Sequence, residues 1–91
     1  MKDKRELINE WVEENFPDQE ILMADGLEEA FEGVAMQFNN PIPIFDYDKC
    51  LEILQKDGMS LLDAEEYMSF NVTGAWLGEG TPAYLFKFKS E

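Results

Sequence analysis

The sequence predicts an α+β protein, with three helices packed on a small antiparallel sheet in a single domain spanning residues 1–91. Apolar residues recur at helical spacing in three separate segments. Shorter runs with the alternation and proline content of strands lie between and after those segments. Hydrophobic residues make up 45% of the 91-residue chain and aromatic residues 13%, which suffices for one modest core.

The first helix is expected over residues 3–16. Its apolar positions fall on one stripe with a period near 3.6 residues: Leu7, Ile8, Trp11, Val12 and Phe16. Asp3 followed by Glu6 resembles a capping box, which marks a helix start. Pro17 ends the helix because proline disfavours α geometry at the residue before it.

A hairpin is predicted after the Asp25-Gly26 turn signal. We expect Leu27–Phe31 to form a short helical turn or loop and Val34–Phe38 to form a strand. Asn39-Asn40 then closes a hairpin onto residues 41–45, where two prolines require an edge strand or a strand start. The alternative is one continuous helix through residues 27–38, interrupted only by Gly33.

Two further helices and a terminal strand complete the prediction. Asp46 or Asp48 can cap the second helix, and Gly58 ends it in the left-handed position typical of helix C-termini. Ser60 with Asp63 opens the third helix as a capping box, and Gly78 and Gly80 stop it. Residues 81–89 alternate well enough to form a terminal strand.

The helical spacing also predicts which side chains face inward. The inward positions of the second helix are Tyr47, Cys50, Leu51 and Leu54, and those of the third are Leu61, Ala64, Tyr67, Met68, Asn71, Val72 and Ala75. An inward amide needs hydrogen-bond partners, so we expect Asn71 to bond to backbone groups of residues 25–33.

Three segments carry a resemblance to a known family. They are ADGLEEAFEGV, IFDYDKCLEIL and DGMSLLDAEEYMSFNVTGAWLGEGTP, and together they span about residues 24–86. In this order they resemble a family of short uncharacterised proteins from phages and bacteria. No activity is established for that family, so the resemblance implies a shared fold and a phage-type setting but no reaction.

Little in the sequence points to catalysis. The chain has no histidine, which is the commonest general base and metal ligand. Cys50 lies on an apolar helix face, where a buried structural thiol is expected rather than a nucleophile. The glycines at 74, 78 and 80 lack the GK[ST] of a phosphate loop. We therefore expect no enzyme activity, no catalytic residue and no cofactor.

No metal site is expected either. Asp46, Asp48 and Glu79 could bind a hard cation, but they lack the oxygen-rich spacing of a calcium loop, and capping and solvation account for them. Trp76 and Tyr84 are expected to be aromatics of the core or its rim.

The sequence favours the cytoplasm, which would be the host cytoplasm for a phage-encoded protein. Its N-terminus lacks the apolar segment of a signal peptide, and no apolar run reaches the ~18–20 residues of a membrane span. The single cysteine excludes an internal disulfide and suits a reducing compartment.

Negative charge dominates the chain, with 20 Asp and Glu against 7 Lys and Arg and a net charge of −13. From Glu6 to Asp48 acidic residues recur and no Lys or Arg occurs. In the first helix, cations stand at the N-terminus and glutamates at the C-terminus, each misplacement costing ~0.3–1 kcal/mol against the macrodipole. The glutamates of this helix also repel one another across ~5–6 Å. Helix stability alone does not explain this arrangement.

Two functions are compatible with this charge. The first is a small phage-type interaction protein that inhibits or modulates a basic, nucleic-acid-handling host protein, as a DNA mimic or an anti-defence (anti-CRISPR-like) inhibitor would. Its partner-binding residues would be Glu6, Glu10, Glu13, Glu14, Asp18 and Glu20. Direct binding to nucleic acid is not expected, because phosphate repels carboxylates. No membrane partner is expected either, since the chain has no apolar run long enough to span a membrane.

Alternatively, the acidic surface serves solubility only. A different class of function remains open as well, that of a small-molecule binding module or an accessory enzyme subunit. Its pocket would lie near five residues of the family-like segments, namely Asp25, Tyr47, Asn71, Trp76 and Glu79.

Overall fold

The α+β class with three helices is confirmed, although the sheet is mixed rather than purely antiparallel. The computed structural model describes residues 2–19, 21–72 and 80–89. In chain order the elements are α1 (Lys4–Asn15), the 3₁₀ turn η1 (Glu28–Ala30), β1 (Phe31–Gln37), β2 (Asn40–Asp46), α2 (Tyr47–Lys56), α3 (Leu61–Tyr67), the π-helical turn η2 (Met68–Val72) and β3 (Ala83–Leu85). Among the described residues the sheet order is β1-β2-β3, with β1 antiparallel and β3 parallel to β2.

The hairpin prediction is confirmed and the alternative helix through residues 27–38 is wrong. Gly33 has a φ of 147°, which a helix cannot contain, and it lies at a bulge where the β1–β2 register shifts. The tight turn lies one residue earlier than expected, at Phe38-Asn39, where both φ values are positive (52° and 63°). Asn40 instead belongs to β2 and pairs with Gln37.

Each of the three helices begins at a side chain that the sequence identified. The carboxylate of Asp3 accepts a hydrogen bond from the Glu6 amide at 2.9 Å. Asp46, rather than Asp48, caps α2, since its Oδ1 accepts from the Lys49 amide at 3.3 Å. The hydroxyl of Ser60 accepts from the Asp63 amide at 3.1 Å. These bonds satisfy amides that the first helical turn leaves without intrahelical partners.

The core lies between α2, α3 and the sheet. Its buried residues come from η1, β2, α2, α3 and the adjoining turns: Leu27, Ala30, Phe45, Cys50, Leu51, Leu54, Ala64 and Met68. Tyr47 and Val72, both predicted core residues, are only partly buried at its edge. Leu61 was predicted to be buried and is 50% exposed. Helical spacing defines a face but does not determine how far neighbouring elements cover it.

The end of the third helix differs from the prediction. The α-helix stops at Tyr67, and the chain continues as the wider π turn η2. This winding rotates the following side chains away from the inward stripe, so Asn71 is exposed. Tyr67 is also exposed, at 39%. Among the described residues Asn71 makes no hydrogen bond to residues 25–33, so that prediction is wrong. Ala75 and Gly78 lie outside the described residues.

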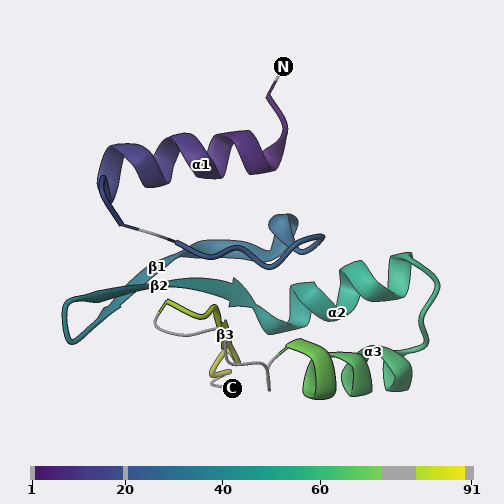
Figure 1. The fold of residues 1–91 in the computed structure, drawn as a ribbon. Helices are drawn as coiled ribbons and strands as arrows, with labels where there is room; N and C mark the ends of the chain where they lie inside the picture. The colour runs from purple at the N-terminus through teal and green to yellow at the C-terminus, as the bar shows by residue number, and fades with distance from the viewer. Residues whose placement is uncertain (1, 20, 73–79, 90–91) are drawn as a thin grey trace.

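The terminal strand is shorter than predicted and runs in an unexpected direction. Only Ala83–Leu85 pairs with β2, in parallel, whereas residues 81–89 were predicted. In Figure 1, β3 lies beside β2, and α1 lies on the opposite side of the hairpin from β3. A strand joined to β2 through two helices can pair in either direction, so the local pattern could not determine this one.

α1 is attached to the rest of the molecule along one side. Ile8 is its one buried described residue, at 4% exposure, while Leu7 and Trp11 of the predicted stripe are 51% and 42% exposed. The Trp11 ring meets Phe31 of β1 edge-on, with the ring centroids 6.2 Å apart. In the described part of the chain, no helix has the length and apolar character needed to cross a membrane.

Candidate functional site: the acidic face of α1

The predicted partner-binding glutamates share one side of α1. At 3.6 residues per turn, positions 6, 10, 13 and 14 fall within an arc of about 100°, centred opposite Ile8. Because Ile8 is buried against the body, this arc points outward, and all four glutamates are exposed. We call Glu6, Glu10, Glu13 and Glu14 the acidic face.

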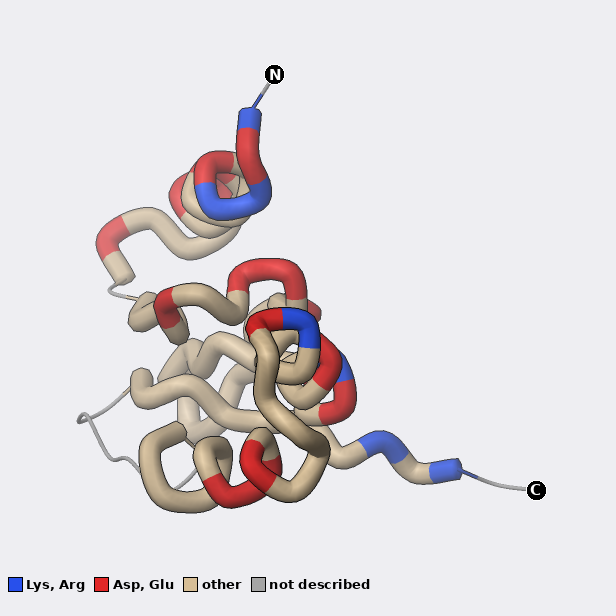
Figure 2. Tube along the Cα trace, turned by 90° about the vertical axis from the view of Figure 1, so that its right-hand side faces the viewer, with Lys and Arg blue, Asp and Glu red and all other residues tan. Residues whose placement is uncertain are grey.

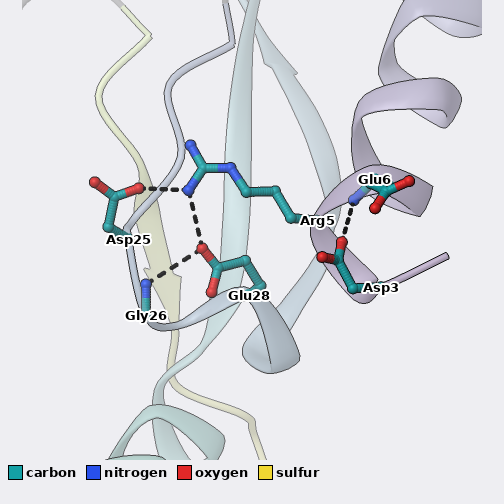
Figure 3. Close-up of polar contacts among 6 residues, drawn as sticks. All are labelled: Asp3, Arg5, Glu6, Asp25, Gly26 and Glu28. Atoms are coloured by element: carbon teal, nitrogen blue, oxygen red, sulfur yellow. Dashed lines mark hydrogen bonds and ion pairs between the residues drawn. The ribbon is translucent and has the colours of Figure 1, made fainter.

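The strongest base of α1 points inward, away from the acidic face. Arg5 Nη1 donates to Asp25 Oδ1 at 2.7 Å and to Glu28 Oε2 at 3.2 Å, as Figure 3 shows. Glu28 Oε2 also accepts a hydrogen bond from the Gly26 amide. Hydrogen bonds therefore join α1, the Asp25-Gly26 turn and η1. The Asp25 hydrogen bond and charge raise the pKa of Arg5, with Glu28 adding to the effect. The Arg5 guanidinium is therefore bound to carboxylates that lie outside α1.

The acidic face keeps most of its charge uncompensated. Glu10 pairs with Lys2, and both side chains are about half exposed. Glu6, Glu13 and Glu14 form no ion pair with any Lys or Arg in the part of the chain that the structure describes. The last turn of α1 contains no basic residue. The folded helix thus has the charge arrangement predicted from the sequence, with bases near its N-terminus and glutamates near its C-terminus, against the helix macrodipole.

Asp18 and Glu20 complete the predicted partner-binding set. Asp18 is exposed just beyond α1, in a left-handed conformation with a φ of 68°. Glu20 lies outside the described residues.

The C-terminal bases lie far from α1. Lys87 pairs with Asp46 at 2.9 Å and Lys89 approaches Asp48 at 3.9 Å. In Figures 1 and 2 the C-terminal segment and α1 lie at different ends of the molecule. Asp46 thus has a close cationic partner and Asp48 a more distant one, and no group of three His, Cys, Asp or Glu among the described residues is placed to hold a metal.

The single thiol and one of the phenols, those of Cys50 and Tyr84, lie in or beside the core. Cys50 is fully buried, as predicted, and this burial raises the pKa of its thiol to about 12. Tyr84 is partly buried beside Phe45, and its pKa is also raised to about 12, chiefly by burial. Both groups are therefore neutral at physiological pH, and Cys50 is not a thiolate nucleophile.

The residues of the alternative, pocket-based function are only partly brought together. Asp25 and Asn71 line the same cavity, whereas Tyr47 is not among its lining residues. Trp76 and Glu79 lie outside the described residues. The cavity also involves Asp57, which the sequence did not single out, and Tyr67, which was expected to face the core rather than a pocket, because the cavity walls come from segments far apart in the chain.

Comparison of the chain with protein-family models, curated proteins and solved structures found no match. Functional inference therefore depends on the geometry and charge of the chain itself.

Proposed function

We propose that this chain is a cytoplasmic binding protein, not an enzyme, and that it inhibits or modulates a basic, nucleic-acid-handling protein of a bacterial host. The acidic face of α1 would be the contact surface. The observation that carries the proposal is a row of exposed glutamates opposite the buried side of α1, retained although it opposes the helix macrodipole.

The spacing of these charges resembles that of a nucleic-acid strand. The acidic face extends about 12 Å along the axis at ~1.5 Å per residue. Its four charges are therefore on average about 4 Å apart along the axis, at uneven intervals, compared with 3.4 Å per strand of duplex DNA. A protein surface that binds a phosphate row would attract this helix for the same electrostatic reason. The resemblance to phage proteins is consistent with a host protein as the partner.

The inward position of Arg5 also supports binding. Solubility does not require that bases be kept away from a surface, because surfaces of mixed sign with a net charge away from zero are also soluble. Here Arg5 is tied to Asp25 and Glu28, and the acidic face is left with Lys2 alone as a pairing base among the described residues. Such a single-sign surface steers a basic partner toward α1.

Capture from a bacterial lysate tests the proposal when matched variants are compared. We would immobilise the wild type, Glu10→Lys/Glu14→Lys on α1, and Glu65→Lys/Glu66→Lys on α3. All four positions are exposed, and the two variants change the net charge equally. We expect a basic protein to bind the wild type and the α3 variant but not the α1 variant.

Competition with DNA tests the nature of the partner. Duplex DNA should release the captured protein, because both ligands would occupy the same basic surface. If the α1 and α3 variants capture the same proteins as the wild type, the acidic face is not a binding surface. If binding needs the acidic face but DNA releases nothing, the partner does not handle nucleic acid through that surface.

A further inference from the structure

A cavity of about 360 Å³ opens on the side of α2 and η2, separate from the acidic face. This volume is within the ~300–1,000 Å³ typical of small-molecule sites. Its apolar lining includes Met23, Leu27 and Leu54, of which Leu27 and Leu54 belong to the buried core. A ligand could therefore bury an apolar body against the core without disturbing it.

Two carboxylates line the cavity. Asp25 and Asp57 line it, and no Lys or Arg is among the described residues that do so. Asp25 is already paired with Arg5, but Asp57 forms no ion pair with any described Lys or Arg. Asp57 is also the C-cap of α2, whose C-terminal end carries a partial negative charge. The carboxylate and the helix end both favour a cation.

Two tyrosines add aromatic walls to the cavity. Tyr67 is 39% exposed, so part of its ring is open to solvent. Tyr84 is partly buried and offers a neutral ring. Aromatic faces attract organic cations, and an exposed contact of this kind contributes ~0.5–1 kcal/mol.

We propose that this cavity binds a small organic cation, namely an ammonium group on an apolar alkyl or aryl body. The ammonium group would lie toward Asp57. The apolar part of the ligand would lie between Tyr67 and the side chains of Leu27 and Leu54. The cavity contains no residue of the acidic face, so this proposal is tested independently of the proposed function.

Ligands that differ only in charge provide the first test. We would titrate the full chain with 2-phenylethylammonium, 2-phenylethanol and 3-phenylpropionate and follow amide chemical shifts. The ammonium compound should saturate, with the largest shifts at cavity residues such as Asp57 and Tyr67. Equal binding of the three compounds, or shifts spread over the acidic face instead, would overturn the proposal.

Charge-matched variants separate a specific site from diffuse attraction to an acidic protein. Asp57→Asn and Glu52→Gln each remove one exposed charge from α2 or its cap, but Glu52 is not a lining residue of this cavity. Asp57→Asn should weaken ammonium binding roughly tenfold, because a hydrogen bond to a charged group is lost. Glu52→Gln should bind like the wild type. Equal weakening by both variants would show that only the net charge attracts the ligand.

Tyr67→Leu tests the aromatic wall while keeping an apolar side chain. It should weaken the ammonium compound about two- to fivefold and leave the binding of 2-phenylethanol nearly unchanged. Thermal melting of each variant establishes that it is folded. An equal loss for both ligands would overturn the cation–aromatic contact.

Discussion

At the residue scale, Phe38 is the clearest conflict between side chain and backbone. It occupies the first central position of the β1–β2 turn with a φ of 52° and is 95% exposed. Left-handed geometry costs an L-residue roughly 1–2 kcal/mol, whereas asparagine tolerates it better. The neighbouring Asn39 fits its position, since turns of this type favour Asn and Gly.

Replacing Phe38 should therefore stabilise the protein. We expect Phe38→Asn to raise the free energy of unfolding by about 0.5–1 kcal/mol, because the strain falls and no packing is lost. Urea denaturation measures this change. Phe88→Asn is the matched control, because Phe88 is 90% exposed and does not have a positive φ. Equal effects of the two substitutions would show that backbone strain at Phe38 is negligible.

Asp46 combines helix capping with an ion pair. It is 7% exposed, caps α2 and pairs with Lys87. The Lys87 hydrogen bond is the main cause that lowers the pKa of Asp46, and the Lys49 amide adds to it against the opposing effect of burial. A carboxylate with a lowered folded pKa stabilises the protein above its unfolded pKa, and this contribution is lost as the pH falls through the folded value.

The pH dependence of Asp46 variants tests this role. We expect Asp46→Ala to cost about 1–2 kcal/mol at neutral pH through the lost cap. Asp46→Asn should cost less because an amide oxygen can still cap the helix. Below the ordinary pKa of 3.8 the difference between Asn and wild type should shrink. Urea denaturation at neutral pH and at about pH 3 measures both effects; a difference that does not depend on pH would contradict the ion-pair role.

At the element scale, the inward faces of α2 and α3 differ in how well they are covered. Leu54 of α2 is 7% exposed in the core, while Leu61 in the first turn of α3 is 50% exposed. We expect Leu54→Ala to cost ~2–5 kcal/mol of unfolding free energy, through lost burial and a cavity. Leu61→Ala should change stability by less than about 1 kcal/mol. Chemical denaturation of both variants measures the difference, and similar losses would mean that the core boundary is wrongly placed.

Elements determined by local chemistry were the ones that the sequence predicted well. Residues close together in the sequence determine the three helix caps, the hairpin after Asp25-Gly26 and the buried face of α2. The parallel pairing of β3 and the Arg5–Asp25 contact join residues far apart in the chain, so no local pattern contains them. The π turn η2 moved Asn71 outward, because helical periodicity holds only while the winding is constant.

The candidate site was predictable to a similar extent. The acidic face could be read from the sequence because it lies on a single helix, and the structure adds that it points outward. The cavity could not, since residues such as Leu27, Leu54 and Tyr84 meet only in the folded molecule. The sequence named Asp25 and Asn71 for such a pocket, from a turn signal and an inward helical position, without any indication of Asp57.

At the scale of the whole molecule, charge is distributed unevenly. The net charge is −13, and four of the seven described bases are paired: Lys2 with Glu10, Arg5 with Asp25 and Glu28, Lys87 with Asp46, and Lys89 with Asp48. The acidic face of α1 remains largely unpaired at one end of the molecule. A basic partner would therefore be drawn toward α1 over a distance set by the ionic strength, about 8 Å at physiological salt.

The binding function of the acidic face is tested most directly by the rate at which a captured partner associates, measured at several salt concentrations. For the wild type and Glu65→Lys/Glu66→Lys this rate should fall steeply with salt, because electrostatic steering governs encounter. For Glu10→Lys/Glu14→Lys it should be slow at every salt concentration, although its thermal stability should equal or exceed that of the wild type as repulsion within α1 is relieved. If the α1 and α3 variants associate at the same rate and with the same salt dependence, the acidic face serves solubility alone.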